Sequence, residues 1–307
     1  MGIAVFGCVF VDIKGYPLAP YIPQGRNIGR VLQVHGGVCR NVAEDIANID
    51  LKPSFITVVD HSGTSTDVIA HLKRHNCDTR YIRRAADAIG TWLAVFDNNG
   101  DVAASISKRP DISLISRTLD EHGETIFREA DSVIVEIDME EYLLERIFAL
   151  AEQYGKKIYA VVSNMSIAME RRRLLQRTGC IVCNQQEAEQ LFSEEYGEVR
   201  PSELADILSR KIRQARIPAM VITLGERGAV YASDSGEAGW CAAQKVDVID
   251  TTGAGDSFFA GVAVGLTYGK TLKESCEIGT RLAASVICTK ENVCPHFLPE
   301  EFGLRAR

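Results

Sequence analysis

Apolar, β-branched runs alternate with segments of helical periodicity along most of the 307 residues of this chain. The runs predict strands, and the periodic segments between them predict helices. Strands that are apolar along their whole length and separated by helices indicate a parallel sheet covered on both faces. We therefore expect an α/β fold with a doubly wound, mostly parallel sheet. The predicted strands are 3–11, 55–59, 133–137, 157–162, 181–183 and 220–224, and the predicted helices are 41–49, 67–74, 139–153, 169–176 and 202–214.

Two regions interrupt this rhythm. Residues 15–33 carry no helical signal, and residues 80–107 alternate like half-exposed strands around a turn at 98–101. We expect the two regions to pair as a small antiparallel sheet, which would be either a lid over a substrate pocket or a decorative edge. The chain is then a single domain, 1–307, with a lid formed by about 13–34 and 80–108.

The composition excludes several classes of function. A net charge of −7 with scattered Lys and Arg lacks the basic stripe of a nucleic-acid binder. No stretch approaches the ~20 apolar residues that span a bilayer. Residues 2–12 lack the basic leader of a signal peptide, and the nine cysteines show no secreted disulfide framework, so we expect a cytoplasmic protein. Cys180 and Cys183 form one CxxC pair, which the surrounding apolar run marks as buried strand rather than zinc site.

The most informative segment reads Asp-Thr-Thr-Gly-Ala-Gly-Asp-Ser-Phe over 250–258 and opens a helix of small residues. Two glycines at a helix N-terminus let the backbone approach an anion, toward which the free N–H groups point. An acidic residue in such a turn would weaken phosphate binding unless it faces another group. We therefore expect the amides of Ala254, Gly255 and Asp256 to hold a transferring phosphoryl group while the Asp256 carboxylate faces a hydroxyl. The alternative is that Asp256 only caps its helix.

The helix N-terminus is also expected to lower the pKa of Asp256, which phosphoryl transfer tolerates because the hydroxyl proton leaves late. Other phosphate motifs do not fit. The segment 265–271 is one residue short of a Walker A loop and is better explained as a helix end followed by a new helix. No GxGxxG follows a predicted strand, which argues against a dinucleotide-binding dehydrogenase.

The segment 250–258 resembles the C-terminal signature of the ribokinase-like (PfkB-type) carbohydrate kinases. Three further features follow the order found in that family, and the resemblance covers essentially the whole chain. They are the glycine pair Gly36 and Gly37 with Asn41 and Ala43, the Asn-x-x-Glu motif from Asn184 to Glu187, and the turn 223–228 with Thr223, Gly225 and Gly228. Segments 11–15, 26–31 and 36–44 are most similar to pseudouridine kinases, although Arg26 and Ile28 stand where those enzymes usually have Ser and Pro.

The resemblance implies a role for each acceptor-side residue. Asp256 would be the base, and Gly253, Ala254 and Gly255 would hold the transferring phosphoryl group. Asp12 and Asn41 would bind sugar hydroxyls, which suits a carboxylate and an amide. Gly36 and Gly37 would allow close approach, and Asn27 would reach the substrate from the lid. Taken singly, Asp12 could equally be a strand-end turn residue and Asn41 a helix cap.

For the nucleotide side, the resemblance implies that Glu187 holds Mg²⁺ through water, with Asn184 orienting that water or a phosphate. Thr223, Gly225 and Gly228 would line the ATP site. Adenine would rest beside the helix that contains Ala283, Ala284 and Ile287. A monovalent cation such as K⁺ would contact backbone carbonyls of Asp250 and Thr252. Otherwise Glu187 is an ordinary acid in the first turn of an acidic helix.

The resemblance therefore implies an ATP-dependent kinase that phosphorylates a primary hydroxyl of a ribosyl compound, with pseudouridine as the leading acceptor. The alternatives are ribose, fructose, a deoxy-sugar acid or another nucleoside. A sugar phosphate is disfavoured because no basic cluster accompanies the substrate motifs, although Arg26 and Arg30 in the lid leave it open. An alternative from another class is a catalytically silent sugar or nucleotide sensor. The expected partner is a small molecule, together with a second copy of the chain bound through the lid.

Overall fold

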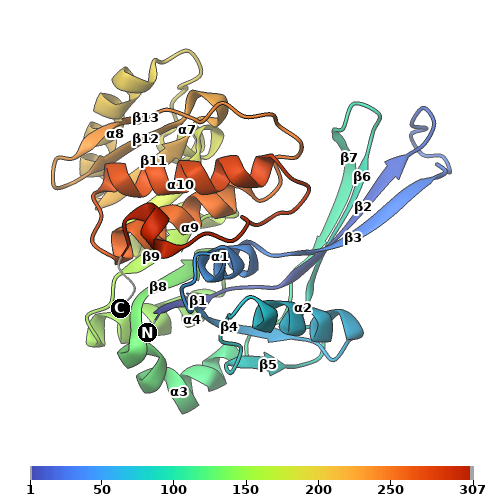
Figure 1. Cartoon of the computed structure of the whole chain (residues 1–307), viewed down its shortest axis with the longest axis horizontal. Coiled ribbons are helices and arrows are strands. Elements are labelled where there is room, and N and C mark those ends of the chain that lie inside the picture. The colour runs from blue at the N-terminus through green and yellow to red at the C-terminus, as the bar shows by residue number, and fades with distance from the viewer. Residues whose placement is uncertain (1, 305–307) are drawn as a thin grey trace.

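The computed structural model describes residues 2–304, which are built around one large sheet (Figure 1). Within these residues, nine strands are arranged in the order β13-β12-β11-β10-β9-β8-β1-β4-β5. The strands are β1 (Gly2–Phe6), β4 (Ser54–Val59), β5 (Ile82–Arg84), β8 (Ala130–Glu136), β9 (Ile158–Val161), β10 (Cys180–Asn184), β11 (Ala219–Thr223), β12 (Ala229–Ser233) and β13 (Ala238–Cys241).

The sheet is parallel from β11 through to β5, and only β12 and β13 run antiparallel at one edge. From β1 the chain moves outward to β4 and β5 on one side, and later returns to build β8 to β13 on the other. The order of the strands thus reverses between β1 and β8. In doubly wound sheets, ligands bind in the crevice outside the carboxyl ends of the strands at such a reversal. The predicted fold class is confirmed.

Helices cover both faces of the sheet, and each face has its own apolar core. One face is covered mainly by α3 (Ile115–Glu129), α4 (Glu141–Gln153), α7 (Gln185–Phe192) and α8 (Pro201–Ala215), with the short α5 (Met165–Glu170) and α6 (Arg172–Leu175) beside them. The other face carries α1 (Val38–Ala47), α2 (Gly63–Arg74), α9 (Ala254–Thr267) and α10 (Leu272–Ile287). Two 3₁₀ turns, η1 (Gly225–Arg227) and η2 (Pro299–Phe302), complete the elements.

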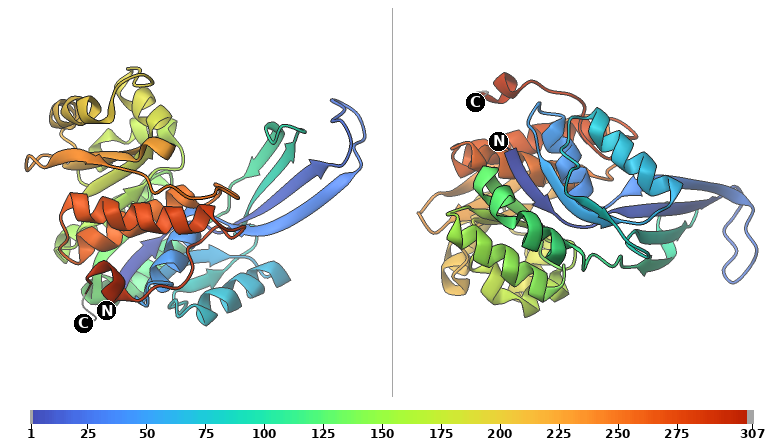
Figure 2. Two further views of the ribbon diagram at one scale, coloured as in Figure 1. Left: turned by 45° about the horizontal axis from the view of Figure 1, so that its top comes forward. Right: turned by 90° about the horizontal axis from the view of Figure 1, so that it is seen from below.

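A second, four-stranded sheet projects from the core as a lid (Figures 1 and 2). Its strands are β3 (Gly29–Gly36), β2 (Phe10–Pro17), β6 (Gly90–Phe96) and β7 (Val102–Lys108), in that spatial order. Asp12 pairs with Trp92, which pairs with Ser107, so these three side chains form one row across the sheet. The next row, Ile13, Leu93 and Ile106, faces the opposite way because side chains alternate along a strand.

The structure corrects some predicted boundaries. The strand expected over 3–11 ends at Phe6, and the chain restarts as β2 in the lid. Between the two strands, Gly7 allows α1 to approach closely, because a Cβ on Gly7 would lie 2.3 Å from the Cβ of Cys39. Residues 82–84 belong to the main sheet as β5, so the lid proper begins at 90 in this half. The lid is mixed rather than purely antiparallel, because β2 and β6 run parallel. The helix expected over 169–176 is divided between α5 and α6.

Cys180 and Cys183 are buried in β10 with free thiols, as the apolar run predicts. Among the helices of residues 2–304, none combines the length and apolar character needed to cross a membrane. The segment after 265 ends α9 and begins α10 at Thr271, whose hydroxyl and the Glu274 carboxylate form a reciprocal capping box.

Candidate active site

A cavity of about 550 Å³ lies at the carboxyl ends of β1 and β8, under the base of the lid. Core helices, core loops and the lid all contribute to its wall. The lining residues are Cys8, Phe10, Asp12, Gly37, Val38, Asn41, Trp92, Ser107, Arg109, Pro110, Ile112, Glu136, Asp138, Met139, Glu140, Ser163, Asn164, Thr252, Gly253, Asp256 and Asn292.

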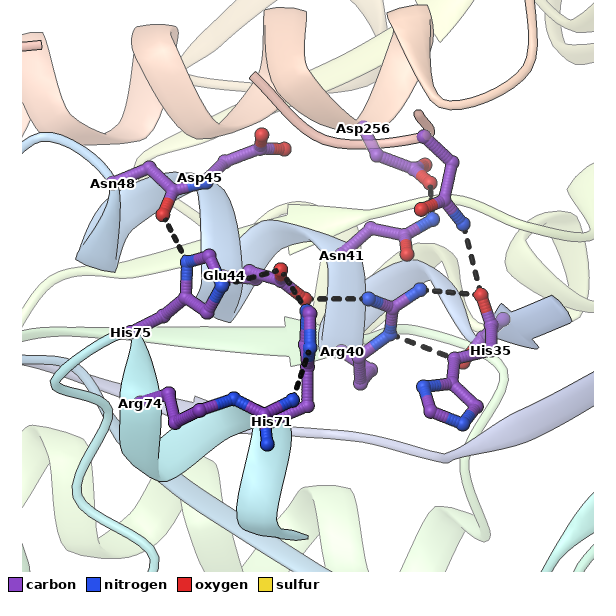
Figure 3. Close-up of polar contacts among 12 residues, drawn as sticks. His35, Arg40, Asn41, Glu44, Asp45, Asn48, His71, Arg74, His75 and Asp256 are labelled. Carbon is purple, nitrogen blue, oxygen red and sulfur yellow. Dashed lines mark hydrogen bonds and ion pairs between the residues drawn. The ribbon is translucent and has the colours of Figure 1, made fainter. Parts of the chain in front are cut away.

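Asp256 and Asn41 both line this cavity, each from the first turn of its helix, and their side chains are in contact (Figure 3). The Asn41 side-chain amide Nδ2 donates to Oδ2 of Asp256 at 2.6 Å. The same side chain is buried, and its Oδ1 has no hydrogen-bond partner among the described residues. A buried carbonyl oxygen without a donor is costly, and a ligand hydroxyl would satisfy it. The structure thus brings these two predicted site residues together on one cavity.

The N-terminus of α9 forms the adjoining wall. Gly253 has a φ of +83°, and a Cβ there would lie 2.1 Å from the carbonyl oxygen of Asn292, so only glycine fits. A Cβ on Gly255 would meet nothing within 4 Å. The N–H groups of Gly255 and Asp256 belong to the first turn and have no intrahelical acceptor. That of Ala254 differs, because it donates to the carbonyl of Thr251 at 3.3 Å.

Burial raises the pKa of Asp256 to about 6. The hydrogen bond from Asn41 and the positive charge of Arg40 lower the pKa, and the nearby Asp12 carboxylate raises it further. The expectation that the helix N-terminus leaves this group with a depressed pKa is thus wrong, since desolvation outweighs the favourable contacts. A carboxylate with a pKa closer to neutrality is a better proton acceptor.

Asp12 reaches the cavity from β2, at the base of the lid. Desolvation raises the pKa of Asp12, against the effect of Lys14 and Arg40. A Cβ on Gly36 would lie 2.7 Å from both Asp12 carboxylate oxygens, so the absence of a side chain at 36 makes room for this carboxylate. Gly37 has a φ of +102° and precedes the first residue of α1. The glycine pair therefore places Asp12 and Asn41 on the same cavity.

A second acidic group, missed in the sequence, lies at the end of β8. Glu136 is buried, with its Oε2 accepting from the backbone N–H of Cys8 at 3.0 Å. The Ser163 hydroxyl lies 3.1 Å from Glu136 Oε1 and 2.9 Å from Asp138 Oδ1. Burial and the neighbouring Asp138 raise the pKa of Glu136. The sequence did contain a signal for Glu136, because an acidic residue at the carboxyl end of a buried parallel strand lies where ligands bind in such sheets.

The predicted nucleotide motifs meet at the ends of β10 and β11, where Asn184 pairs with Thr223. Glu187 and Asn184 form a capping box at the start of α7: Asn184 Oδ1 accepts from the Glu187 N–H, and Glu187 Oε2 accepts from the Asn184 N–H at 2.7 Å. Desolvation raises the pKa of Glu187. Gly225 and Gly228 bound the η1 turn with positive φ angles. None of these residues lines the cavity that contains Asp256.

Three other predicted residues occupy different surroundings. Asn27 lies near the tip of the lid, where its side chain bonds Ile22 and Gly25 of its own loop rather than the cavity. The Asp250 carboxylate accepts from the N–H of Thr252 at 2.8 Å, which lowers the pKa of Asp250 together with other contacts. Thr252 lines the cavity, and Asp250 does not.

A doubly wound sheet with a β lid, joined over a cavity that holds a carboxylate at a glycine-rich helix N-terminus, defines the ribokinase-like class of kinases. Comparison with known proteins gives the same class. The family model described as pfkB family carbohydrate kinase matches residues 2–297, and the chain belongs to this family of kinases.

Individual relatives differ in their acceptors. The chain is 34% identical to the guanosine-inosine kinase of Exiguobacterium acetylicum, over 94% of this chain and 95% of that protein. It is 26% identical to the pseudouridine kinase of Escherichia coli, over 89% and 86% respectively. The structure of Arabidopsis thaliana ribokinase complexed with ribose and ATP superposes with a TM-score of 0.78 at 17% identity, covering 96% of each chain, and thus shares the fold.

Proposed function

We propose that this kinase transfers the γ-phosphate of ATP to the 5′-hydroxyl of a nucleoside, with guanosine or inosine as the acceptor. The observation that carries the proposal is the contact between Asn41 and Asp256 inside the cavity. It places a proton acceptor of raised pKa beside an amide oxygen that lacks a partner. A ribose could satisfy both groups at once.

In this proposal, the ribose enters with its 5′-hydroxyl at the Asp256 carboxylate. Asp12 accepts a hydrogen bond from one of the vicinal 2′- and 3′-hydroxyls, and Asn41 Oδ1 accepts from the other. The 5′-oxygen forms a bond to the γ-phosphorus as the bond to the β,γ-bridging oxygen breaks. The hydroxyl proton passes to Asp256, and ADP leaves with the electron pair of the broken bond. Transfer then depends on positioning and charge stabilisation.

The N–H groups of Gly255 and Asp256 would hold the migrating phosphoryl group, next to Gly253. Glu187 keeps Oε1 outside the capping box, so its donor set fits a hydrated Mg²⁺. When bound with ATP, that ion would neutralise phosphate charge. Backbone carbonyls of Asp250 and Thr252 would contact K⁺. Activity measured with K⁺ replaced by tetramethylammonium tests the last point.

The adenine would lie beside the end of α10, close to the turn formed by Thr223, Gly225 and Gly228. Ile249 donates its N–H to the carbonyl of Ile287 at 2.7 Å, which brings the loop 246–249 to the helix that contains Ala283 and Ala284. The side chains of Val248 and Ile249 are exposed there. Exposed apolar side chains next to a nucleotide site are typical of an adenine slot.

The choice of acceptor depends on the acidic end of the cavity. With the 5′-hydroxyl at Asp256, the base of a nucleoside would extend toward Asp138, Ser163 and Asn164. A carboxylate can accept from the N1–H of hypoxanthine or guanine, and the amide of Asn164 can donate to O6. The 34% identity with a guanosine-inosine kinase over nearly the whole chain supports this choice.

Pseudouridine is the second candidate acceptor. Segments 11–15, 26–31 and 36–44 resemble pseudouridine kinases, and the identity with one such enzyme is 26%. Its uracil also presents N–H donors and carbonyl acceptors. The departures at Arg26 and Ile28, and the lower identity, favour the purine nucleosides.

The lid supports a further part of the proposal, a homodimer. The face of the lid opposite the cavity row is apolar, and Val31 and Ile106 on it are 71% and 70% exposed. A second copy of the chain, pairing lid against lid, would bury this face.

The free state of all nine cysteines supports a cytoplasmic location.

A panel of acceptors tests the proposal. ADP release with Mg²⁺ and ATP is measured for inosine, guanosine, pseudouridine, uridine, adenosine, ribose and fructose, and the products are identified by mass spectrometry. We expect the highest kcat/KM for inosine and guanosine, with 5′-monophosphates as products. A higher kcat/KM for pseudouridine would make pseudouridine the acceptor and leave the proposed mechanism unchanged. A preference for free ribose or fructose would overturn the nucleoside assignment.

A further inference from the structure

Two histidines, His71 in the last turn of α2 and His75 at its C-terminal cap, face the buried Glu44, which lies one helical turn after Asn41 on α1 (Figure 3). His71 and His75 are one helical turn apart, so their side chains lie on the same face of α2. Glu44 is 1% exposed, and the two imidazoles are 33% and 35% exposed. One potential ligand atom from each residue lies within 4.8 Å of the others.

The hydrogen bonds around His75 fix which ring nitrogen carries its proton. Asn48 donates its Nδ2 to the carbonyl of Cys294 at 2.6 Å, so the Asn48 Oδ1 is the atom that faces His75. His75 Nδ1 lies 2.7 Å from this oxygen and must donate to it. A neutral imidazole carries its single proton on only one of its two ring nitrogens. The other nitrogen, Nε2, then carries a lone pair.

That lone pair faces Glu44 Oε1, 3.8 Å away. His75 Nε2 and Glu44 Oε1 are both electron-rich and lie 3.8 Å apart, a separation that favours a cation between them. His71 Nε2 lies on the same oxygen at 2.6 Å. Ligands bound at ~2.0–2.1 Å in tetrahedral geometry lie roughly 3.3 Å apart, a value between these two separations. Small side-chain adjustments therefore suffice to admit an ion.

The remaining contacts of Glu44 resemble those of a metal ligand. Its second oxygen, Oε2, accepts from Arg40 Nη1 at 2.6 Å, which holds the carboxylate and leaves Oε1 for another partner. Arg40 also donates to the backbone carbonyls of His35 and Gly36, so its charge is shared with groups other than Glu44. Outer hydrogen bonds of this kind, on both Glu44 and His75, orient ligands in metal sites.

We infer that Glu44, His71 and His75 bind one divalent ion of the zinc class, separate from the Mg²⁺ used with ATP. Two imidazoles and one carboxylate suit Zn²⁺ or Co²⁺ and leave a fourth position for water. Binding requires the other tautomer of His71, with its proton moved through solvent from Nε2 to Nδ1. Arg74, which now contacts His71 Nδ1 at 3.3 Å, then moves aside.

The ion would join α1 to α2. Asn41, on the same helix as Glu44, lines the substrate cavity. Binding to the folded state alone stabilises it by mass action. We therefore expect Zn²⁺ to raise the midpoint of thermal unfolding, with no requirement for ATP or acceptor.

Cobalt(II) provides the direct test. Purified protein is titrated with Co²⁺ in the presence of excess Mg²⁺, and visible absorption reports four-coordinate cobalt. The variants are His71→Gln, His75→Gln and the double substitution, and the control is His122→Gln on α3, which lies outside the cluster. We expect one equivalent bound by the wild type and the control, and at least ~10-fold weaker binding by each single variant. Circular dichroism establishes that all variants are folded.

The nine free thiols are the competing ligands, and the spectrum separates them. Cobalt on nitrogen and oxygen lacks the intense near-ultraviolet band of cobalt on thiolate. Saturable binding of one equivalent of cobalt without that band supports the site formed by Glu44, His71 and His75. In the double variant, both this binding and the Zn²⁺-dependent rise in unfolding temperature should be lost. Equal affinity in the double variant, a thiolate band that accounts for the bound cobalt, or no saturable binding would overturn it.

Discussion

The side-chain amide of Asn41 donates to the carboxylate of Asp256 at 2.6 Å, across 215 positions of sequence. The contact joins the N-terminal turn of α1 to that of α9, so two helix N-termini face one cavity. Both ends carry partial positive charge, which favours an anionic group between them. This convergence, rather than either motif alone, makes the cavity suitable for phosphoryl transfer.

Replacing Asp256 with Asn removes the proposed proton acceptor while keeping the size of the side chain. We expect kcat to fall at least ~10²-fold, in line with the loss of a positioned base. ATP binding, measured by calorimetry, should be retained because the carboxylate faces the acceptor. Turnover close to that of the wild type would remove Asp256 from its role.

The pH profile should reflect the raised pKa of Asp256. The carboxylate must be unprotonated to accept a proton, so kcat/KM is expected to fall as the pH decreases through about 6. Asn41→Ala removes a hydrogen bond that lowers this pKa, and the acidic limb should move to higher pH. Asn99→Ala in the lid turn serves as the control. An unmoved limb in Asn41→Ala would show that another group controls the profile.

Gly36→Ala should weaken acceptor binding. The new Cβ would lie 2.7 Å from both Asp12 carboxylate oxygens and displace them. Misplacement of a positioning group can lower the reaction rate by up to ~10²-fold. We expect KM for the acceptor to rise about tenfold, while KM for ATP is unchanged. Gly63→Ala is the matched control, since a Cβ there meets nothing within 4 Å. Equal KM values in the two variants would contradict the role of Gly36.

Asp138→Asn tests how the base is recognised. Loss of a charged acceptor for the purine N1–H should lower kcat/KM for guanosine and inosine about ten- to a hundredfold, the usual value of one hydrogen bond to a charged group. Free ribose lacks the base, so any activity toward ribose should be unaffected and provides an internal control. An equal loss for ribose and guanosine would mean that Asp138 supports the cavity rather than selecting the base.

Ile106→Lys should disrupt the proposed dimer. A charged side chain in the apolar outer face of the lid would oppose its burial against a second copy. Light scattering after gel filtration should give a dimer for the wild type and a monomer for this variant. Glu198→Lys, in an exposed loop of the core, is the control. A wild-type protein that is already monomeric at micromolar concentration would contradict the dimer.

Much of this arrangement could be predicted from the sequence, because strand and helix periodicities are local properties. The glycine-rich turn at 253–255 also has a local signature, and Asp256 beside it lines the cavity. Asn41 and Asp12 could be grouped with Asp256 only through the resemblance to a family. Their proximity depends on the order of the strands, which periodicity does not determine.

The residues that sequence reasoning missed depend on long-range geometry. Glu136 reaches the cavity because β8 lies beside β1 at the reversal of strand order. Trp92 and Ser107 reach it because the lid strands pair in one particular register. The apolar run Val246, Val248 and Ile249 before the glycine-rich turn has the composition of a strand, yet the structure has no strand there, and Val248 and Ile249 are exposed. Exposed apolar residues near a proposed ligand site cannot be told from core by hydrophobicity alone.

The lid is a single layer of strands, and this has a consequence for variation in its sequence. Deleting or inserting one residue within β6 would shift every later side chain of that strand to the opposite face. Trp92 would then leave the cavity, while the apolar Leu93 would turn toward the acceptor. Changes of length in this sheet should therefore be confined to its hairpin tips, whereas substitutions can adjust one face with little effect on the other.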